Sequence, residues 1–196
     1  VGMVGVMRDV NKHATPGFKR EGDVVVVIGG LRGASLAGSE YLEIVHGKVL
    51  GRPPFPDLAS EKRVSGLVRR LIAAGIVDTA HDISGGGEIV AVAEMALAGG
   101  LGFEYDEREL DGLILGWGGG RVDVGFFGEA SGSVILAVSR ARWQDFQDAL
   151  GDVVWDQIGT VGGDRFRVGD LIDVDLDELK QAYERDLFEQ HAPEGG

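Results

Sequence analysis

The chain has no cysteine among its 196 residues. This absence excludes a disulfide scaffold, a zinc site built on thiolates and a cysteine nucleophile. Positive charge is also scarce, because 19 basic side chains stand against 32 acidic ones and leave a formal net charge of -13. Proteins that bind nucleic acid through its phosphates need clustered positive charge, so we expect no nucleic-acid partner.

Long apolar runs are missing as well. The longest covers residues 24–30 and is far shorter than the roughly 20 residues of a membrane span, so we expect no membrane partner. The chain opens with VGMVGVM, which has no initiator methionine and no basic segment, so we do not expect these residues to be a signal peptide. The alternation of these residues predicts a strand over residues 2–9, and we expect the chain to be a piece of a longer protein.

What is present fits a folded protein. Hydrophobic residues make up 44% of the chain, and 33 glycines are scattered among them rather than gathered in a linker. A hydrophobic fraction of this size supports a buried core, and the length suits a single domain. We therefore expect one domain over residues 1–190 and a disordered tail over residues 191–196.

Strands and helices are expected to interleave along the chain. Apolar runs predict strands over residues 23–28, 77–83, 102–105, 133–138 and 153–161, and one or two strands over residues 166–174. Helical spacing predicts helices over residues 39–45, 57–74, 88–97, 143–150 and 176–188, whereas residues 106–131 are expected to be loop-rich. This order indicates the α/β (α+β) class, with a mixed β-sheet flanked by helices.

The strongest local signal for a binding site is the segment HDISGGGE at residues 81–88. A strand there ends in a polar turn, and Gly85, Gly86 and Gly87 lead into a helix. Backbone N–H groups at a helix start attract anions, and glycine lets a ligand come close to the backbone. Asp82 supplies the hard oxygen that Mg²⁺ prefers. The alternative is a turn that needs glycine for its geometry alone.

Two further segments are weaker candidates. Glu129, Ala130 and Ser131 precede the expected strand at residues 133–138, where small neighbours leave room for a ligand contact. The glycine-rich residues 30–39 form either a loop that covers a ligand or a long connection. For both segments an ordinary connection between elements is the alternative.

Three other features are better explained by structure. Asp173, Asp175 and Asp177 resemble the start of a calcium loop, but Glu178 occupies the position that requires glycine, so a helix cap on Asp175 is expected. That helix would bury the side chains of Leu176, Leu179, Tyr183 and Leu187. The four histidines lie far apart in the sequence, and Trp117, Trp143 and Trp155 are expected to pack in the core or an interface.

A set of short segments in a fixed order resembles one known family. These segments are VGMVGV at 1–6, GFK at 17–19, GSEYL at 38–42, HDISGGG at 81–87, AEMA at 93–96, GEAS at 128–131 and IGTVGG at 158–163. Together they are similar to the C-terminal end of phosphoribosylformylglycinamidine synthase, over nearly the whole chain. The resemblance implies an AIR synthase C-terminal domain fold, partly ferredoxin-like, from a chain several times longer.

The resemblance also implies an activity. The family uses ATP and Mg²⁺ to convert formylglycinamide ribonucleotide to the amidine in purine biosynthesis, with ammonia released from glutamine. The partners it implies are the N-terminal domains of the same enzyme, a glutaminase subunit or domain and the ribonucleotide substrate, all in the cytoplasm. Self-association through an exposed sheet is also expected. The catalytic histidine of the family lies outside these residues, so the chain alone is expected to be inactive.

Position by position, the resemblance makes Asp82 a magnesium ligand and Ser84 a nucleotide contact. It places Glu129, Ala130 and Ser131 in a loop that faces substrate or nucleotide. Ser133 stands where the family often has arginine, so a charged phosphate contact is not expected there. Two alternatives stay open: a non-catalytic half that binds a structural nucleotide, and a related ATP-dependent enzyme of the same superfamily.

Overall fold

The computed structural model describes residues 2, 4–7, 9–29, 35–115 and 121–189. The expected tail at residues 191–196 and the expected packing of Trp117 lie outside these residues. The described residues form a seven-stranded sheet with the order β2-β4-β1-β5-β3-β6-β7. The strands are β1 Val24–Ile28, β2 Thr79–Asp82, β3 Phe103–Tyr105, β4 Val134–Val138, β5 Trp155–Val161, β6 Arg165–Val168 and β7 Ile172–Asp175.

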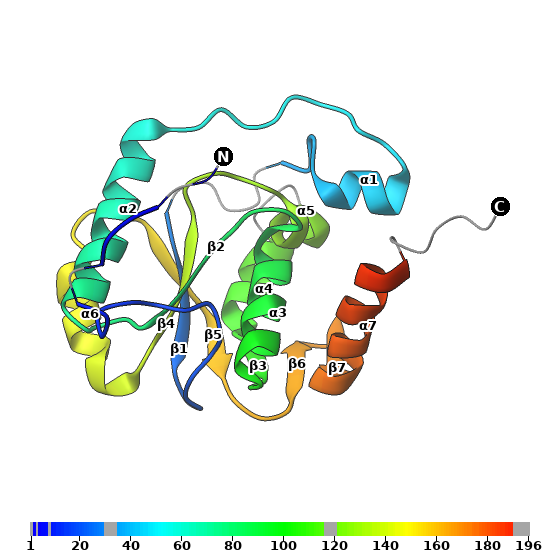
Figure 1. Ribbon diagram of the computed structural model, residues 1–196. Coiled ribbons are helices and arrows are strands. Elements are labelled where there is room, and N and C mark those ends of the chain that lie inside the picture. Colours follow the sequence, from blue (N-terminus) through cyan, green and yellow to red (C-terminus); the bar gives the residue numbers. More distant parts are fainter. Residues whose placement is uncertain (1, 3, 8, 30–34, 116–120, 190–196) are drawn as a thin grey trace.

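The sheet is mixed, as the sequence predicts. Neighbouring strands run antiparallel, except that β3 and β6 are parallel. The helices are α1 Glu40–His46, α2 Leu58–Ala73, α3 Gly87–Gly99, α4 Glu107–Leu115, α5 Val122–Phe127, α6 Trp143–Ala149 and α7 Leu176–Glu189. In Figure 1, α2 and α6 lie on one side of the sheet, and α3, α4 and α7 lie on the other.

Strand β1 lies at the centre of both hydrophobic cores, because all five of its residues are buried. Val24, Val26 and Ile28 pack with α2, α6 and one face of β4. Val25 and Val27 point to the opposite face, which α3, α4 and α5 cover. A strand that is apolar on both faces needs a helical layer on each side, which explains why helices cover both faces of β1.

Several expected helix signals are confirmed. Asp57 accepts hydrogen bonds from the N–H groups of Ala59 and Ser60, at 3.0 and 3.1 Å, and so caps α2. Asp175 accepts from the N–H of Glu178 at 2.7 Å, which confirms a helix cap in place of a calcium loop. Trp143 and Trp155 pack edge to face with ring centroids 5.8 Å apart, as expected of core residues.

The expected buried face of α7 is partly wrong. Leu176 and Leu179 pack against the core, but Tyr183 is 51% exposed. The side chain of Leu187 lies outside the described part of the chain. Helix α7 packs on the outer side of α3 near the end of the sheet, and among its described side chains those near its start reach the core (Figure 1).

The expected strand over residues 2–9 is also wrong. Residues 2, 4–7 and 9 have no regular structure, and the side chains of Val4 and Val6 are 103% and 96% exposed. Alternation of residue types along a strand determines which face of the sheet each side chain occupies. The strand itself forms only where the edge of a sheet offers hydrogen-bond partners. At the outer edge of β2, the Ala80 N–H donates to the carbonyl oxygen of Thr15, and the Thr15 N–H donates to the carbonyl oxygen of Asp78.

The described part of residues 106–131 contains the helices α4 and α5, where a loop-rich segment was expected. Asp106 begins α4 by accepting hydrogen bonds from the N–H groups of Arg108 and Glu109, at 3.0 and 3.3 Å. Leu110, Leu113 and Phe126 are buried in the core that also contains α3. Short helices draw their stability from such packing rather than from their own propensity, which explains why the local sequence did not reveal them.

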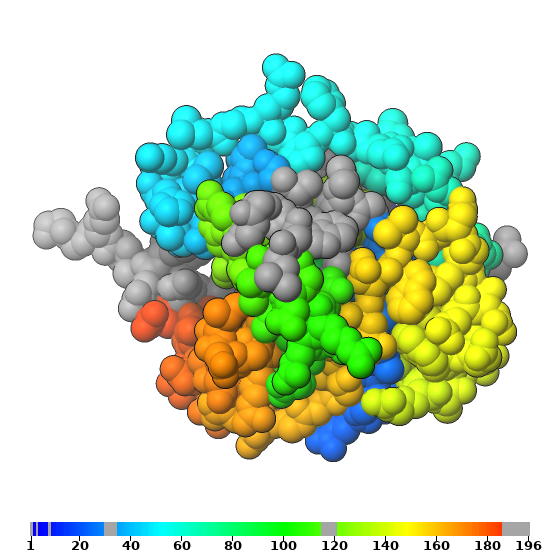
Figure 2. Space-filling model, turned by 180° about the vertical axis from the view of Figure 1, so that it is seen from behind, coloured from blue at the N-terminus to red at the C-terminus, as the bar shows by residue number. Residues whose placement is uncertain are grey.

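Most of the strongly exposed apolar side chains lie on two segments outside the strands, and the expected self-association through an exposed sheet stays a prediction. They gather on the N-terminal segment and between α1 and α2. In Figure 2 the α1–α2 connection, drawn in cyan, runs along the upper edge of the molecule. The exposed apolar residues of these two regions are Val4, Val6, Met7, Val10, Ile44, Val45, Val49, Leu50, Phe55 and Leu58.

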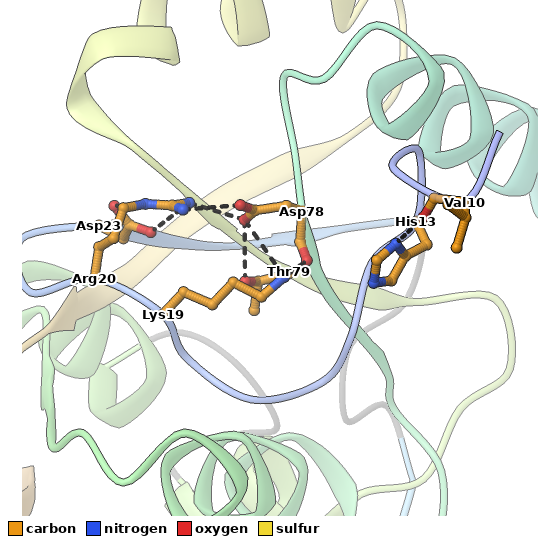
Figure 3. Close-up of polar contacts among 7 residues, drawn as sticks. All are labelled: Val10, His13, Lys19, Arg20, Asp23, Asp78 and Thr79. Atoms are coloured by element: carbon orange, nitrogen blue, oxygen red, sulfur yellow. Dashed lines mark hydrogen bonds and ion pairs between the residues drawn. The ribbon is translucent and has the colours of Figure 1, made fainter.

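A cluster of charged side chains joins the starts of β1 and β2 (Figure 3). The Arg20 guanidinium donates two hydrogen bonds to the carboxylate of Asp78, both at 2.8 Å. It also lies 3.1 Å from Asp23 Oδ2, and Lys19 donates to the backbone oxygen of Asp78. Bidentate pairs of this kind fix the relative position of two segments as well as adding energy.

The cluster shifts the pKa values of its members in opposite directions. The hydrogen bond from Arg20 holds the pKa of Asp78 below its ordinary value, and the same contact raises the pKa of Arg20. Burial raises the pKa of Asp23, although Arg20 opposes that rise. Asp78 therefore stabilises the fold in its charged form, and Asp23 offsets part of this gain.

We expect Asp78→Asn to lower the free energy of unfolding by about 1 kcal/mol near neutral pH, since the charged pair is half exposed. A lowered native pKa stabilises the fold above the unfolded pKa of about 4, and this contribution disappears as the pH falls through the native value. Urea denaturation of both proteins should give a constant difference above about pH 5 that shrinks in acid. Asp111→Asn, in the exposed face of α4, is the control. A difference that grows in acid would contradict this assignment.

Candidate functional site

The glycine turn at residues 84–87 connects the end of β2 to the start of α3. Gly86 and Gly87 have left-handed backbone angles, with φ of 81° and 77°. A Cβ atom on Gly87 would lie 2.6 Å from the carbonyl oxygen of Phe126, and one on Gly86 would lie 2.7 Å from Val90 Cγ2. Both positions therefore require glycine for geometry and close packing, whatever the turn binds.

Two N–H groups of the turn, those of Gly86 and Gly87, donate to acceptors within the protein. The Gly87 N–H donates to the carbonyl oxygen of Ser84 at 3.2 Å. The Gly86 N–H donates to Glu129 Oε1 at 3.0 Å, and the same oxygen accepts from the Glu40 N–H at 2.8 Å. One internal carboxylate thus bonds both the turn and the first residue of α1.

A cleft of about 680 Å³ opens beside the turn, between α1, α3, α5 and α7. This volume lies within the range of roughly 300–1,000 Å³ that is typical of small-molecule sites. Tyr41 and Phe127 stack in its wall, with ring centroids 4.6 Å apart. The described lining consists of Glu40, Tyr41, Ile44, Val45, Ser84, Gly85, Gly86, Val90, Glu94, Phe127 and Tyr183.

The cleft therefore contains three of the predicted site residues: Ser84, Gly85 and Gly86. Glu129 reaches it through the hydrogen bond to Gly86. Ala130 and Ser131 continue into the turn before β4 and, like Gly87 and Asp82, lie outside its described lining. Of the glycine-rich residues 30–39, those at 30–34 lie outside the described chain, whereas Ser39 caps α1 by accepting from the Leu42 N–H.

The electrostatics of the cleft are acidic. The Glu40 carboxylate packs over Gly85, since a Cβ atom there would lie 2.7 Å from Glu40 Oε1. Glu94 and Glu129 add two more carboxylates around the turn. Glu88 does not contribute, because it is buried and accepts a hydrogen bond from the Tyr105 hydroxyl at 2.8 Å. A phosphate that enters this cleft therefore needs a divalent cation to screen it.

Asp82 can provide one ligand to such a cation but not a closed site. Its side chain is 76% exposed at the end of β2, with Oδ1 3.7 Å from His81 Nδ1. Within the described ranges, no three His, Asp or Glu side chains come together as a metal site. Mg²⁺ commonly binds one or two carboxylates and keeps several waters and phosphate oxygens, so Asp82 fits as a single ligand.

Sequence reasoning missed the residues that face the glycine turn from other elements. Glu40 and Tyr41 come from α1, Phe127 ends α5, and His81 Nε2 lies 3.2 Å from Glu94 Oε2 of α3. The expected cap at Ser39 does locate the start of α1, which places Glu40 in its first turn. Nothing in the sequence indicates that this helix lies against the turn at residues 84–87.

The helices described in the structure include none with the length and apolar character to cross a membrane. This agrees with the short apolar runs in the sequence.

Known proteins similar to this chain point to one family. A sequence profile described as AIR synthase related protein, C-terminal domain, matches residues 20–170. The phosphoribosylformylglycinamidine synthase subunit PurL of Anaeromyxobacter dehalogenans is 37% identical over 194 residues, which are 93% of this chain and 24% of that protein. The subunit of the same name from Moorella thermoacetica is 39% identical over 95% of this chain and 25% of its own length. The chain thus spans about a quarter of these relatives.

Solved structures share the fold. Thermotoga maritima PurL complexed with ATP superposes with a TM-score of 0.62 at 17% identity, over 85% of this chain and 27% of that one. The complex of the same protein with FGAR gives a TM-score of 0.66 at 20% identity, over 87% and 30% of the two chains. Escherichia coli HypE gives a TM-score of 0.53 at 21% identity, over 83% and 52%.

At these identities the structural similarity establishes the fold alone, and it agrees with the mixed sheet flanked by helices that the sequence predicts. The sequence profile reaches further, because its match covers β1 to β6 and the glycine turn. The chain therefore belongs to the family of AIR synthase related proteins, as their C-terminal domain.

Proposed function

We propose that this chain is the C-terminal domain of a phosphoribosylformylglycinamidine synthase. The observation that carries the proposal is the extent of the sequence match. Relatives with this name align with 93–96% of the chain at 36–39% identity. Their names describe a whole subunit, of which this chain corresponds to about a quarter.

The proposed reaction makes a carbon–nitrogen bond in purine biosynthesis. ATP transfers its terminal phosphate to the amide oxygen of formylglycinamide ribonucleotide. Ammonia attacks the activated carbon, phosphate leaves with that oxygen, and the amidine forms. A glutaminase subunit or domain supplies the ammonia, and the N-terminal domains of the enzyme supply the catalytic histidine. We place the reaction in the cytoplasm.

In this proposal the cleft at the glycine turn holds the nucleotide. Ser84 supplies a hydroxyl, Gly85 and Gly86 allow close approach, and the ring surfaces of Tyr41 and Phe127 offer an apolar wall. Asp82 contributes one oxygen to Mg²⁺, which screens the phosphates from the surrounding carboxylates. Thermotoga maritima PurL forms complexes with ATP, with AMPPCP and with FGAR, which supports the assignment.

A second candidate is a scaffold half that binds nucleotide without turning it over. The hydrogen bonds within the turn favour it, because Gly86 donates to Glu129 and Gly87 donates to Ser84. A related ATP-dependent enzyme of the superfamily is a further alternative, since HypE shares the fold. Variants in the cleft of the intact enzyme separate the first two candidates, because they lower the rate of the reaction directly only if the cleft is the site of turnover.

We expect Asp82→Asn to weaken binding of Mg-ATP to the intact enzyme on the order of tenfold, because one charged ligand of the cation is lost. Without Mg²⁺ neither protein should bind ATP measurably, since phosphates and carboxylates repel each other. Isothermal titration with and without Mg²⁺ measures both effects, and Asp111→Asn serves as the matched control. An unchanged affinity in Asp82→Asn would remove Asp82 from the site.

Gly86→Ala should weaken Mg-ATP binding as well. The left-handed backbone at this position costs a residue with a Cβ about 1–2 kcal/mol, and that Cβ would also press on Val90. Gly75→Ala is the matched control, because Gly75 has φ of 67° but open space around its Cβ position. If both variants lose the same stability and neither loses affinity, the glycine turn is purely structural.

The chain by itself should not catalyse the reaction. The purified protein of 196 residues is incubated with formylglycinamide ribonucleotide, Mg-ATP and ammonia, and the amidine is measured by mass spectrometry. We expect no product, because the catalytic histidine comes from another domain, whereas the intact synthase gives product under the same conditions. Amidine formed by this chain alone would contradict the proposal that another domain supplies the catalytic histidine.

We further expect the chain to associate with a second copy or with its neighbouring domains, through the exposed apolar side chains between α1 and α2. Leu50 and Phe55 are 59% and 82% exposed there, and clustered apolar surface favours association. Multi-angle light scattering should show a mass that rises with concentration, and Leu50→Ser with Phe55→Ser should reduce it. Leu171→Ser, at a surface position 54% exposed, should not. A monomer at every concentration would contradict self-association.

A further inference from the structure

Glu129 has an unusual position beside the proposed nucleotide site. A single oxygen of its carboxylate accepts hydrogen bonds from the Gly86 N–H at 3.0 Å and the Glu40 N–H at 2.8 Å. Gly86 belongs to the turn before α3, and Glu40 is the first residue of α1. A carboxylate on a backbone N–H is the same kind of acceptor as a phosphate oxygen, so Glu129 already occupies the donor that an anionic ligand would use at Gly86.

The contacts of Glu129 also hold α1 in place. None of the residues of α1 is buried, so packing alone holds this helix weakly. Its other described contacts include the stacking of Tyr41 on Phe127 and the packing of the Glu40 carboxylate over Gly85. The bond to Glu40 is therefore one of few ties between α1 and the rest of the domain.

A ligand phosphate and the Glu129 carboxylate compete for the Gly86 N–H, and the same carboxylate also docks α1. An N–H group makes one good hydrogen bond, so a phosphate oxygen at Gly86 must displace Glu129 Oε1. Charge adds to the competition, because the carboxylates of Glu129 and Glu40 flank the turn and repel an incoming phosphate. Once displaced, Glu129 no longer bonds the Glu40 N–H from its present position.

We propose that Glu129 is a positioning residue that holds the place of a ligand phosphate at the glycine turn and that nucleotide binding releases the N-terminus of α1. This inference rests on the proposed function for the identity of the ligand, Mg-ATP. Tyr41, Ile44 and Val45 of α1 line the cleft, so release of the helix widens the entrance to the site. Ligand binding and opening of the cleft are thereby coupled through one side chain.

The first test concerns α1 without ligand, in the full-length protein that carries this chain. Hydrogen–deuterium exchange is measured for peptides that cover residues 40–46 in the wild type, Glu129→Ala and Glu43→Gln. Loss of a charge-assisted acceptor should speed exchange of α1 about tenfold in Glu129→Ala. Glu43→Gln removes an exposed charge from the same helix and should leave exchange within twofold. Equal exchange in Glu129→Ala and the wild type would overturn the positioning role.

The second test distinguishes competition from a merely structural role. Glu129→Gln keeps an oxygen acceptor but loses the charge, so it should bind Mg-ATP several-fold more tightly than the wild type, because neutral hydrogen bonds are about half as strong. A structural cap would leave the affinity unchanged or lower it, and either result would overturn the proposal.

The wild type completes the test, with saturating Mg-ATP as the probe. Exchange of residues 40–46 should rise when nucleotide binds. Binding measured by titration without that rise overturns displacement of Glu129 and leaves the proposed function intact. If neither the wild type nor Glu129→Gln binds Mg-ATP, the proposed function and the displacement of Glu129 are both overturned. In that case the exchange measured in Glu129→Ala still decides whether Glu129 docks α1.

Discussion

Burial of β1 on both faces is the constraint on which the rest of this domain depends. Five consecutive apolar residues, four of them valine, leave neither face of the strand compatible with water. Helices α2 and α6 enclose one face, and α3, α4 and α5 enclose the other. The three-layer arrangement follows, because a strand of this kind is stable only between two apolar layers.

The candidate site follows from the way α3 packs against this sheet. Helix α3 leaves β2 through a turn so close to α5 that Gly87 has no room for a side chain. The same approach brings Phe127 and Glu129 to the turn, where they meet α1 through ring stacking and a shared carboxylate. The cleft thus lies where α5 and α7 pack on α3 and where α1 meets them through a few side-chain contacts.

The candidate site is strongly acidic. The chain carries a net charge of -13, and the cleft concentrates that excess in Glu40, Glu94 and Glu129. An acidic cleft beside a glycine turn binds a phosphate only together with a metal cation. The acidity that argues against nucleic acid therefore remains compatible with a nucleotide bound as its magnesium complex.

Local sequence determined much of this protein. Apolar runs located β1, β4 and β5, acidic caps marked the starts of α2 and α7, and the glycines at 85–87 marked the turn before α3. These features depend on neighbours along the chain, so they are visible in the sequence. The alternating residues 2–9 and the segment that contains α4 and α5 depend on distant partners, and the local pattern misled at both. Only the tertiary structure decided that Glu129 bonds Gly86 and Glu40, because that contact joins three segments separated by more than forty residues. The type of a side chain determines what it can bind, whereas the packing of the helices on the sheet determines which partner lies next to it.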